Sequence, residues 1–389
     1  MEINELLKEA YSLGASDLHI KVGSQPTLRV NGELTPLTSQ GRVTREDVLK
    51  IALSVMNPGQ QEVFKKRNDI DLAYSIPGLG RFRCNVFVQR GTIGIAFRIL
   101  PTKIPTIEEL NLPEIVKKIS MEERGLILVT GTTGSGKTTT LATMIDLINT
   151  NKTKHVMTIE DPIEYLHRDK RSIVNQREIG NDTESFSKAL RYALRQDPDV
   201  ILVGEMRDFE TIQTALIAAE TGHLVLSTLH TIDATETVNR IISVFPPFQH
   251  KQIRLQLASV LKAIISMRLL PRADGKGRVP AVEILIATAT IKECILDPDK
   301  TRLIHDAIAQ GAIHYSMQTF DQSLFSLLKS GLITYEEALR GATNPDDFAL
   351  KAKGIQSTTD LTFEQLSPPQ AEDKMKIERF TPHHRKPQV

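Results

Sequence analysis

The stretch "LVTGTTGSGKTTTL", from Leu128 to Leu141, decides how the chain around it folds. The pattern G-x-x-x-x-G-K-[ST] is matched in full by Gly131, Gly136, Lys137 and Thr138. An apolar run at 126–129 precedes the pattern and predicts a buried strand, and apolar residues at helical spacing follow it. A strand, a glycine-rich loop and a helix in this order are the context of a P-loop. We therefore predict a phosphate-binding loop at this point of the chain.

The residue types of the loop suit a nucleotide. Glycines allow successive backbone N–H groups to turn toward an anion, and the N-terminus of the following helix adds a favourable dipole. Lys137 is expected to reach the β- and γ-phosphates of ATP, and the Thr138 hydroxyl to ligate Mg²⁺. The predicted nucleotide-binding residues are Gly131, Thr132, Thr133, Gly134, Ser135, Gly136, Lys137, Thr138 and Thr139. A flexible glycine-rich linker would have no reason to carry this spacing between a strand and a helix.

The composition of the chain excludes several classes of protein. Its 389 residues suggest two or three domains. A formal net charge of +1 does not indicate a nucleic-acid partner or an anionic membrane surface. The two cysteines, Cys84 and Cys294, form no CxxC pair, so we expect neither a zinc site nor a disulfide scaffold.

The chain also lacks the patterns of secretion and membrane insertion. Its first residues, "MEINELLKEA", are acidic and amphipathic, unlike a signal peptide. No apolar run approaches the ~20 residues of a membrane span. We expect a cytoplasmic protein that meets a membrane only through its partners.

Four segments are expected along the chain. Residues 1–100 are predicted to be an α+β domain, with a hairpin at Asn31-Gly32 and three strands of alternating pattern after residue 68. The proline-containing segment 101–112 is interpreted as a linker. Alternating strands and helices at 113–350 predict a parallel α/β sheet. The polar segment 351–389 is interpreted as a disordered tail.

In the α/β segment, four apolar runs are each followed at once by polar residues. The first, 126–129, leads into the P-loop, and the others are 156–159, 200–203 and 224–229. The polar residues that follow these three runs include Glu160, Glu164, Glu205 and His230. Because ligands of open α/β sheets bind at the carboxyl ends of the strands, we expect these groups to converge on one nucleotide.

The acidic residues suggest roles in hydrolysis. Glu205, after "DVILVG", is the candidate Walker B acid, which could bind Mg²⁺ through water or orient the attacking water. Glu160 and Glu164 flank Pro162 on a predicted turn, and either could be the general base. The sequence does not rank these three carboxylates. His230 could sense the state of the nucleotide or simply be packed.

Arginines bear on whether the site is shared between chains. Arg81, Arg83 and Arg98 are predicted on the polar face of the first domain's sheet. Phosphoryl transfer gains strongly from an arginine that is often supplied in trans. Each of the three arginines could act in this way or be an ordinary solvated charge.

These motifs together resemble a known family. "GTTGSGKTTTLATMID", "TIEDPIEY", "RYALRQDPDVILVGEMRD" and "TGHLVLSTLHT" are similar to the Walker A motif, Asp box, Walker B motif and His box of the ATPases of type II secretion and type IV pili. "GASDLHIKVGSQPTLRVNGEL" resembles that family's PAS-like N-terminal domain, and the similarity spans about 1–350. Within the family, the chain is most similar to the PilT branch of pilus retraction motors.

The resemblance implies a RecA-like P-loop ATPase domain preceded by an α+β PAS-like domain. It also implies a homohexameric ring that binds ATP and Mg²⁺ between the domains, receives trans arginines from a neighbour, and acts on an inner-membrane pilus platform protein without zinc or nucleic acid. By motif position, Lys137 and Thr138 would bind phosphate and Mg²⁺, and Glu160 and Glu164 would be the Asp-box acids. Glu205 would be the Walker B acid and His230 the main His-box residue.

Alternatives remain at the level of sequence. The PilT branch usually carries an "AIRNLIRE"-like helix, whereas this chain has "TRLIHDAIAQG" at 301–311. This difference leaves room for an accessory retraction motor or another specialised member. An extension or secretion ATPase, a RecA-like nucleic-acid motor and a nucleotide-gated scaffold without turnover are separate alternatives. The near-zero net charge argues against the nucleic-acid motor. The intact Lys137, Thr138 and Glu205 argue against the scaffold.

Overall fold

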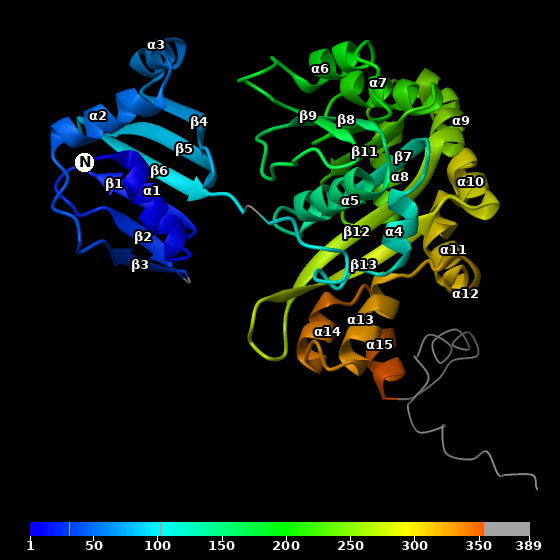
Figure 1. The fold of residues 1–389 in the computed structure, drawn as a ribbon. Coiled ribbons are helices and arrows are strands. Elements are labelled where there is room, and N and C mark those ends of the chain that lie inside the picture. Colours follow the sequence, from blue (N-terminus) through cyan, green and yellow to red (C-terminus); the bar gives the residue numbers. More distant parts are fainter. Residues whose placement is uncertain (31, 102, 354–389) are drawn as a thin grey trace, which may run out of the picture.

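The computed structural model describes residues 1–30, 32–101 and 103–353. It contains two β-sheets, and Figure 1 shows them as two bodies joined by a single connecting segment. We call residues 1–100 the N-terminal unit and residues 113–353 the C-terminal unit. Asn31 of the predicted hairpin lies outside the described residues, as does the predicted tail from residue 354 onward.

The N-terminal unit is a six-stranded sheet covered by helices. Its strands are antiparallel to their neighbours and lie in the order β3-β2-β1-β6-β5-β4. They are β1 (Asp17–Lys21), β2 (Thr27–Val30), β3 (Glu33–Pro36), β4 (Asp69–Ile76), β5 (Gly80–Gln89) and β6 (Thr92–Ile99). The helices are α1 (Ile3–Ser12), α2 (Arg45–Val55) and α3 (Pro58–Arg67). The three alternating segments of the sequence form the adjacent strands β4, β5 and β6.

Local sequence explains most of these elements. In β5, Phe82, Cys84 and Val86 are buried, whereas Arg83 between them is exposed, as period-2 alternation requires. Thr44 starts α2 with a capping box, in which its side chain accepts from the N–H of Asp47. The prediction missed β1 and α3. The helix α3 buries Phe64 alone among its residues, so it has no hydrophobic stripe to detect.

The C-terminal unit is built on a seven-stranded sheet in the order β13-β12-β7-β11-β10-β8-β9. All neighbouring strands are parallel except β12 and β13. The strands are β7 (Gly125–Thr130), β8 (His155–Glu160), β9 (Ile173–Glu178), β10 (Val200–Val203), β11 (Leu224–Leu229), β12 (Leu261–Pro271) and β13 (Arg278–Ile286). The four apolar runs of the sequence are β7, β11, β10 and β8, which lie side by side. Their carboxyl ends therefore share one edge.

Helices cover both faces of this sheet, which makes the unit an α/β fold (Figure 1). They are α4 (Ile115–Ser120), α5 (Lys137–Asn151), α6 (Phe186–Ala193), α7 (Phe209–Glu220), α8 (Ala234–Ser243), α9 (His250–Val260), α10 (Ala289–Leu296), α11 (Ile304–Gln310) and α12 (Ala312–Tyr315). In β7, Leu126 and Leu128 join one core cluster, whereas Ile127 and Val129 join the other. Burial on both faces explains why this strand is a continuous apolar run.

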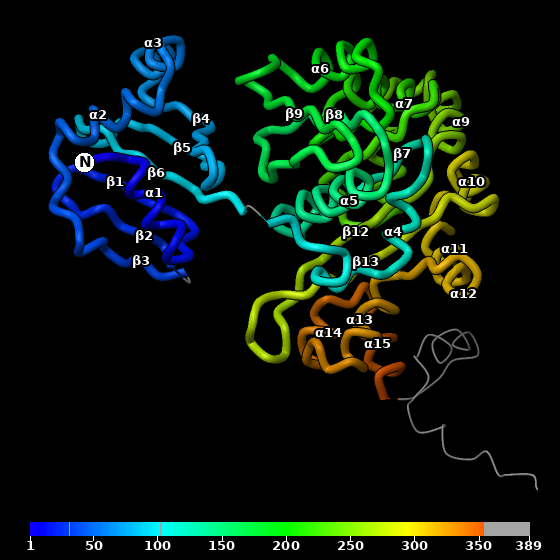
Figure 2. The backbone as a smooth tube through the Cα atoms, in the orientation of Figure 1, coloured from blue at the N-terminus to red at the C-terminus, as the bar shows by residue number. Residues whose placement is uncertain are grey.

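A third group of helices ends the described chain. It comprises α13 (Phe320–Lys329), α14 (Tyr335–Gly341) and α15 (Pro345–Ala352). These helices enclose a separate small core around Phe320 and Phe348, to which Leu270 and Val279 of the β12–β13 hairpin contribute. Figure 2 shows this hairpin extending from the sheet toward the three helices. The hairpin and the last three helices are thus packed into one core.

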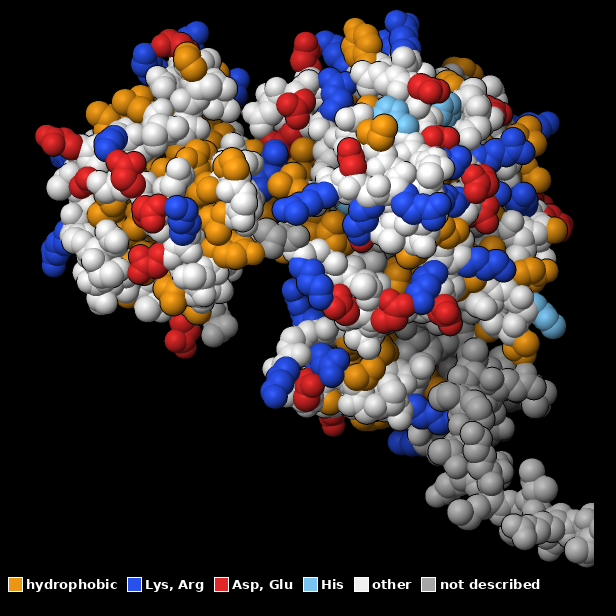
Figure 3. All heavy atoms as spheres, in the orientation of Figure 1, with side chains coloured by type: hydrophobic (Ala, Val, Ile, Leu, Met, Phe, Trp, Pro, Cys, Tyr) orange, Lys and Arg blue, Asp and Glu red, His pale blue; other side chains and the backbone are white. Residues whose placement is uncertain are grey.

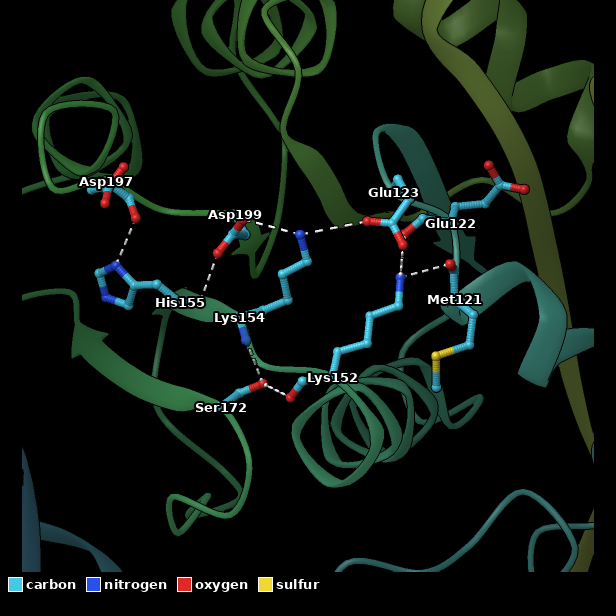
Figure 4. Close-up of polar contacts among 9 residues, drawn as sticks. All are labelled: Met121, Glu122, Glu123, Lys152, Lys154, His155, Ser172, Asp197 and Asp199. Carbon is cyan, nitrogen blue, oxygen red and sulfur yellow. Dashed lines mark hydrogen bonds and ion pairs between the residues drawn. The ribbon is translucent and has the colours of Figure 1, made fainter.

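A polar network joins the turns at the amino-terminal edge of the sheet (Figure 4). Lys152 donates to Met121 O at 2.7 Å and pairs with Glu123 at 2.7 Å. Lys154 pairs with Asp199 at 3.1 Å and with Glu123 at 3.5 Å. The network connects the segments that lead into β7, β8 and β10. Single exposed pairs contribute little, whereas several charges that share partners form a network.

The surface carries charges of both signs. In Figure 3, Lys and Arg side chains are interspersed with Asp and Glu over the face shown. Within the described part of the chain, no helix is both long enough and apolar enough to cross a membrane.

Candidate functional site

The glycine-rich loop lies between β7 and α5, and its backbone explains its glycines. Gly131, Gly134 and Gly136 have φ angles of 140°, 78° and 101°, in the region that favours glycine. A Cβ atom at Gly131 would lie 2.5 Å from Met267 O of the neighbouring strand β12. Position 131 therefore excludes every other residue for two independent reasons.

Two polar side chains of the loop point to an anion ligand. The Lys137 side chain is buried, and its Nζ donates to Gly131 O at 2.8 Å and Thr132 O at 2.9 Å. Burial lowers the pKa of Lys137, and the nearby charge of Glu205 opposes that effect. The Ser135 hydroxyl is buried and has no hydrogen-bond partner among the described residues. Together with the N-terminus of the 15-residue helix α5, this cradle fits a phosphate group.

A cleft of about 710 Å³ opens over the loop and collects the residues predicted from four strands. Its lining includes Thr133, Gly134, Gly136, Lys137, Thr138, Thr139, Glu160, Glu164, Glu205 and His230. Gly131, Thr132 and Ser135 belong to the loop but do not line the cleft. The side chains meet here because β7, β11, β10 and β8 are neighbours with a common carboxyl edge. A cavity of this size accommodates a nucleotide.

Glu205 lies at the centre of a small polar cluster after β10. Its Oε1 is 2.5 Å from Arg207 Nε and 3.3 Å from His230 Nε2. The preceding Gly204 faces β8, where a Cβ would lie 3.1 Å from Ile159 O. This close approach gives a steric reason for glycine at a position where many Walker B motifs carry aspartate.

The two Asp-box acids have different surroundings. Glu160 is the last residue of β8, not part of a turn as expected, and its Oε1 accepts from Thr158 Oγ1 at 2.6 Å and Gln176 Nε2 at 3.0 Å. Burial raises the pKa of Glu160, although these hydrogen bonds oppose the rise. Glu164 lies in the following loop and is exposed to the cleft. The structure thus separates two carboxylates that the sequence left equivalent.

The three N-terminal arginines do not line the nucleotide cleft of their own chain. Arg98 pairs with Asp17 at 3.0 Å, and Arg83 lies 3.7 Å from Asp71. Arg81 instead reaches the C-terminal unit, where its Nη2 donates to Glu178 Oε2 at 2.6 Å. Arg81 and Arg83 line a second cleft, of about 660 Å³, between the two units.

Sequence reasoning missed two groups that line the nucleotide cleft. His167 is largely buried, which lowers its pKa to about 4, so its imidazole is neutral at physiological pH. Arg278 comes from the start of β13, far along the chain from the P-loop. Neither lies in a recognisable motif, and only the fold brings them to the site.

A buried carboxylate accepts a hydrogen bond at the end of the His-box loop. Glu283 of β13 accepts from the N–H of Ala234, the first residue of α8, at 2.8 Å. The helix α8 follows His230 by four residues, so this bond fixes the end of the His-box loop. Burial raises the pKa of Glu283 to about 7, and Arg268 on the adjacent strand opposes the rise. Ser266 of β12 also accepts a hydrogen bond, at 3.0 Å, from Oγ1 of Thr130, the residue that precedes the P-loop.

The predicted metal ligands have the right chemistry for Mg²⁺. Among the described residues, no group of three or more His, Cys, Asp or Glu side chains could bind a metal ion by itself. Mg²⁺ commonly takes one or two protein oxygens together with phosphate and water. Thr138 and Glu205, which line the same cleft, supply oxygens of that kind.

Comparisons with known proteins decide the family. The model of the family described as "Type II/IV secretion system protein" matches residues 1–314. The chain belongs to this family. It is therefore a nucleotide-binding ATPase, with the α/β fold that its sequence predicted, and the resemblance to secretion ATPases is confirmed.

Individual members of the type II/IV secretion family cover almost the whole chain. The type IV pilus retraction ATPase PilT of Pseudomonas aeruginosa is 45% identical over 348 residues, which are 90% of this chain and all of PilT. PilU of the same organism, a type IV pilus ATPase, is 43% identical and covers 92% of this chain and 94% of its own length. A crystal structure of the retraction motor PilT with bound ADP superposes with a TM-score of 0.83 at 48% identity, covering 89% and 98% of the two chains.

Proposed function

We propose that this protein is a motor ATPase that hydrolyses ATP to drive the retraction of type IV pili. The observation that carries the proposal is the convergence of the P-loop, Glu164, Glu205 and His230 on one nucleotide-sized cleft. This arrangement occurs in a chain that is similar to PilT over nine-tenths of its length.

The residues of the cleft divide the chemistry between them. The loop N–H groups and Lys137 would bind the phosphates of ATP, and the Thr138 hydroxyl would hold Mg²⁺, which when bound would supply positive charge beside the phosphoryl group. We assign the general base to Glu164, because it is exposed to the cleft. Glu160 is only partly exposed and already accepts two hydrogen bonds through one oxygen. Glu205 orients the attacking water. His230 Nε2 lies 3.3 Å from Glu205 Oε1, so His230 stands beside the same water position.

The assembly proposed is a homohexameric ring at the cytoplasmic face of the inner membrane. Residues 1–100 would be the PAS-like domain, 101–112 the linker, 113–350 the ATPase domain and 351–389 a tail. Arg83 and Arg98 are exposed at the surface of the N-terminal sheet, where a neighbouring subunit's nucleotide could meet them. The ring would act on an inner-membrane pilus platform protein. The formal net charge of +1 argues against nucleic acid as the partner.

Shared sites can be tested by mixing variants. If Arg81, Arg83 or Arg98 acts in trans, protein with that arginine changed to alanine should regain ATPase activity when it is mixed with Lys137→Ala protein. Each mixed ring then contains interfaces with an intact loop and an intact arginine. No gain at any mixing ratio would argue against trans arginines.

Deletion of the gene in its host tests the direction of the motor. We expect extra surface pili together with loss of twitching, restored by the unaltered gene and not by Lys137→Ala. A loss of pili would instead indicate an extension motor.

A second candidate is an accessory retraction motor. The chain is almost as similar to PilU, a second type IV pilus ATPase of the same organism, as it is to PilT, so the identities do not separate the two. The altered segment at 301–311, which spans the end of the 3₁₀ turn Pro298–Leu303 and all of α11, agrees with such a specialised role. Normal pili and normal twitching after deletion would support the accessory role.

A further inference from the structure

The most informative polar contact outside the nucleotide cleft joins the two units. Glu178, the last residue of β9, has a side chain that is 4% exposed. Its Oε2 accepts from Arg81 Nη2 of the N-terminal unit at 2.6 Å and from the backbone N–H of Ile163 at 3.0 Å. Its Oε1 accepts from Asn181 Nδ2. One buried carboxylate thus binds both units of the protein.

The second partner of Glu178, Ile163, lies between residues that line the nucleotide cleft. The loop 160–164, which begins at the last residue of β8, carries Glu160 and Glu164 into that cleft. Asp161 and Pro162 of the same loop line both the nucleotide cleft and the cleft between the units. The loop therefore separates the nucleotide cleft from the cleft between the two units.

We propose that Glu178 is a coupling residue, which makes the orientation of the N-terminal unit depend on the position of the loop 160–164. Because Arg81 and Ile163 N–H share one oxygen, a displacement of the loop changes the position at which the Arg81 guanidinium is held. A buried ion pair loses much of its stability when one partner is displaced, so the contact favours two discrete arrangements over a gradual drift.

Two further observations agree with an Arg81 side chain that can exchange its bond to Glu178 for another partner. Arg81 Nε is buried and has no hydrogen-bond partner among the described residues, so the guanidinium has an unused donor in this arrangement. The charge of Arg81 also reaches Glu160 in the nucleotide cleft, where it opposes the effect of burial on the pKa of that carboxyl. While Arg81 is bound to Glu178, it is not available to a neighbouring subunit.

The inference rests on nucleotide binding from the proposed function and does not depend on the pilus. It is tested by two spin labels on the full chain, at Lys66→Cys of α3 and Gln213→Cys of α7, both of which are exposed. The native Cys84 and Cys294 are buried, so the labels go to the introduced thiols. Labelled chain is diluted into unlabelled chain, so that the measured distance lies within one subunit. ADP is the probe, and its binding is titrated separately.

In the unaltered chain, we expect ADP to shift the distance between the labels. Glu178→Gln should bind ADP and lose this shift, because the neutral amide no longer forms the buried ion pair with Arg81. The matched control is Glu184→Gln, which removes an exposed carboxylate paired with Lys188, and it should retain the shift.

Three results would overturn the inference. The first is a Glu178→Gln variant that shifts as the unaltered chain does, which would make the contact mere packing. The second is an unaltered chain that binds ADP without any shift. The third is failure to bind ADP at all, which would also overturn the proposed function and is recognised from the titration. If Glu178→Gln does not fold, Glu178→Asp, which keeps the charge on a shorter side chain, is expected to reduce the shift in the same way.

Discussion

Replacing Glu283 by glutamine should stabilise the protein at about pH 8 and leave its stability nearly unchanged at about pH 5. The reason lies in the surroundings of this carboxyl. Burial raises its pKa from 4.5 to about 7, while the hydrogen bond from Ala234 N–H and the charge of Arg268 oppose the rise and the charges of Asp233 and Asp321 add to it. Glutamine keeps an acceptor oxygen for Ala234 and has no proton to lose.

The sign of the effect on stability follows from the direction of the pKa shift, and its size follows from the size of that shift. A raised pKa means that the folded protein binds this proton more tightly than the unfolded chain does. The resulting stability is complete below the unfolded pKa of 4.5 and is lost as the pH rises through about 7. At about 1.4 kcal/mol for each pH unit between the two values, the loss is about 3 kcal/mol.

Urea unfolding at the two pH values measures this difference. Circular dichroism is the suitable signal, because the chain contains no tryptophan. The control is Glu293→Gln, which removes an exposed carboxylate paired with Lys300 and should follow the unaltered protein at both pH values. If Glu283→Gln is less stable than the unaltered protein by the same amount at both pH values, the carboxyl is ionised throughout and the reasoning is wrong.

Three further predictions concern the nucleotide cleft and the P-loop beneath it. Lys137→Ala should weaken ADP binding by about 10- to 150-fold in a calorimetric titration, the equivalent of one charge-assisted hydrogen bond, and an unchanged Kd would contradict its role. Glu205→Gln should bind ADP normally and lower kcat by about 100-fold or more, so loss of binding would point to a structural role instead. Gly131→Ala should lower the urea midpoint more than Gly134→Ala does. The first alanine meets Met267 O at 2.5 Å, whereas the second has open space and bears only the cost of a positive φ, about 1–2 kcal/mol. Equal midpoints would refute the steric argument.

Predictions from sequence succeeded where the signal is local. The P-loop spacing, the apolar runs that became β7, β8, β10 and β11, and the alternating strands of the first sheet are each readable within a few residues. The weak elements were missed for the same reason. The helix α3 has a single buried residue. The strand β1 has only five residues, and it precedes the first predicted hairpin in the sequence.

The roles of the acidic residues could not be ranked from sequence, because their difference is one of environment. Glu160 and Glu164 are four residues apart and chemically identical, and both line the cleft, yet Glu160 accepts hydrogen bonds from Thr158 and Gln176 while Glu164 is exposed. That distinction comes from the neighbouring strand β9, which supplies Gln176.

By itself, the sequence determined the phosphate-binding loop and the presence of polar groups at the ends of four strands, because both depend on residues that are adjacent in the chain. Tertiary structure alone decided which strands are neighbours, and so which groups share a cleft. It also placed Arg278 at the nucleotide cleft and Arg81 on Glu178, 97 residues away in the chain. Contacts of this kind depend on the order of strands in a sheet, which no local pattern of side chains encodes.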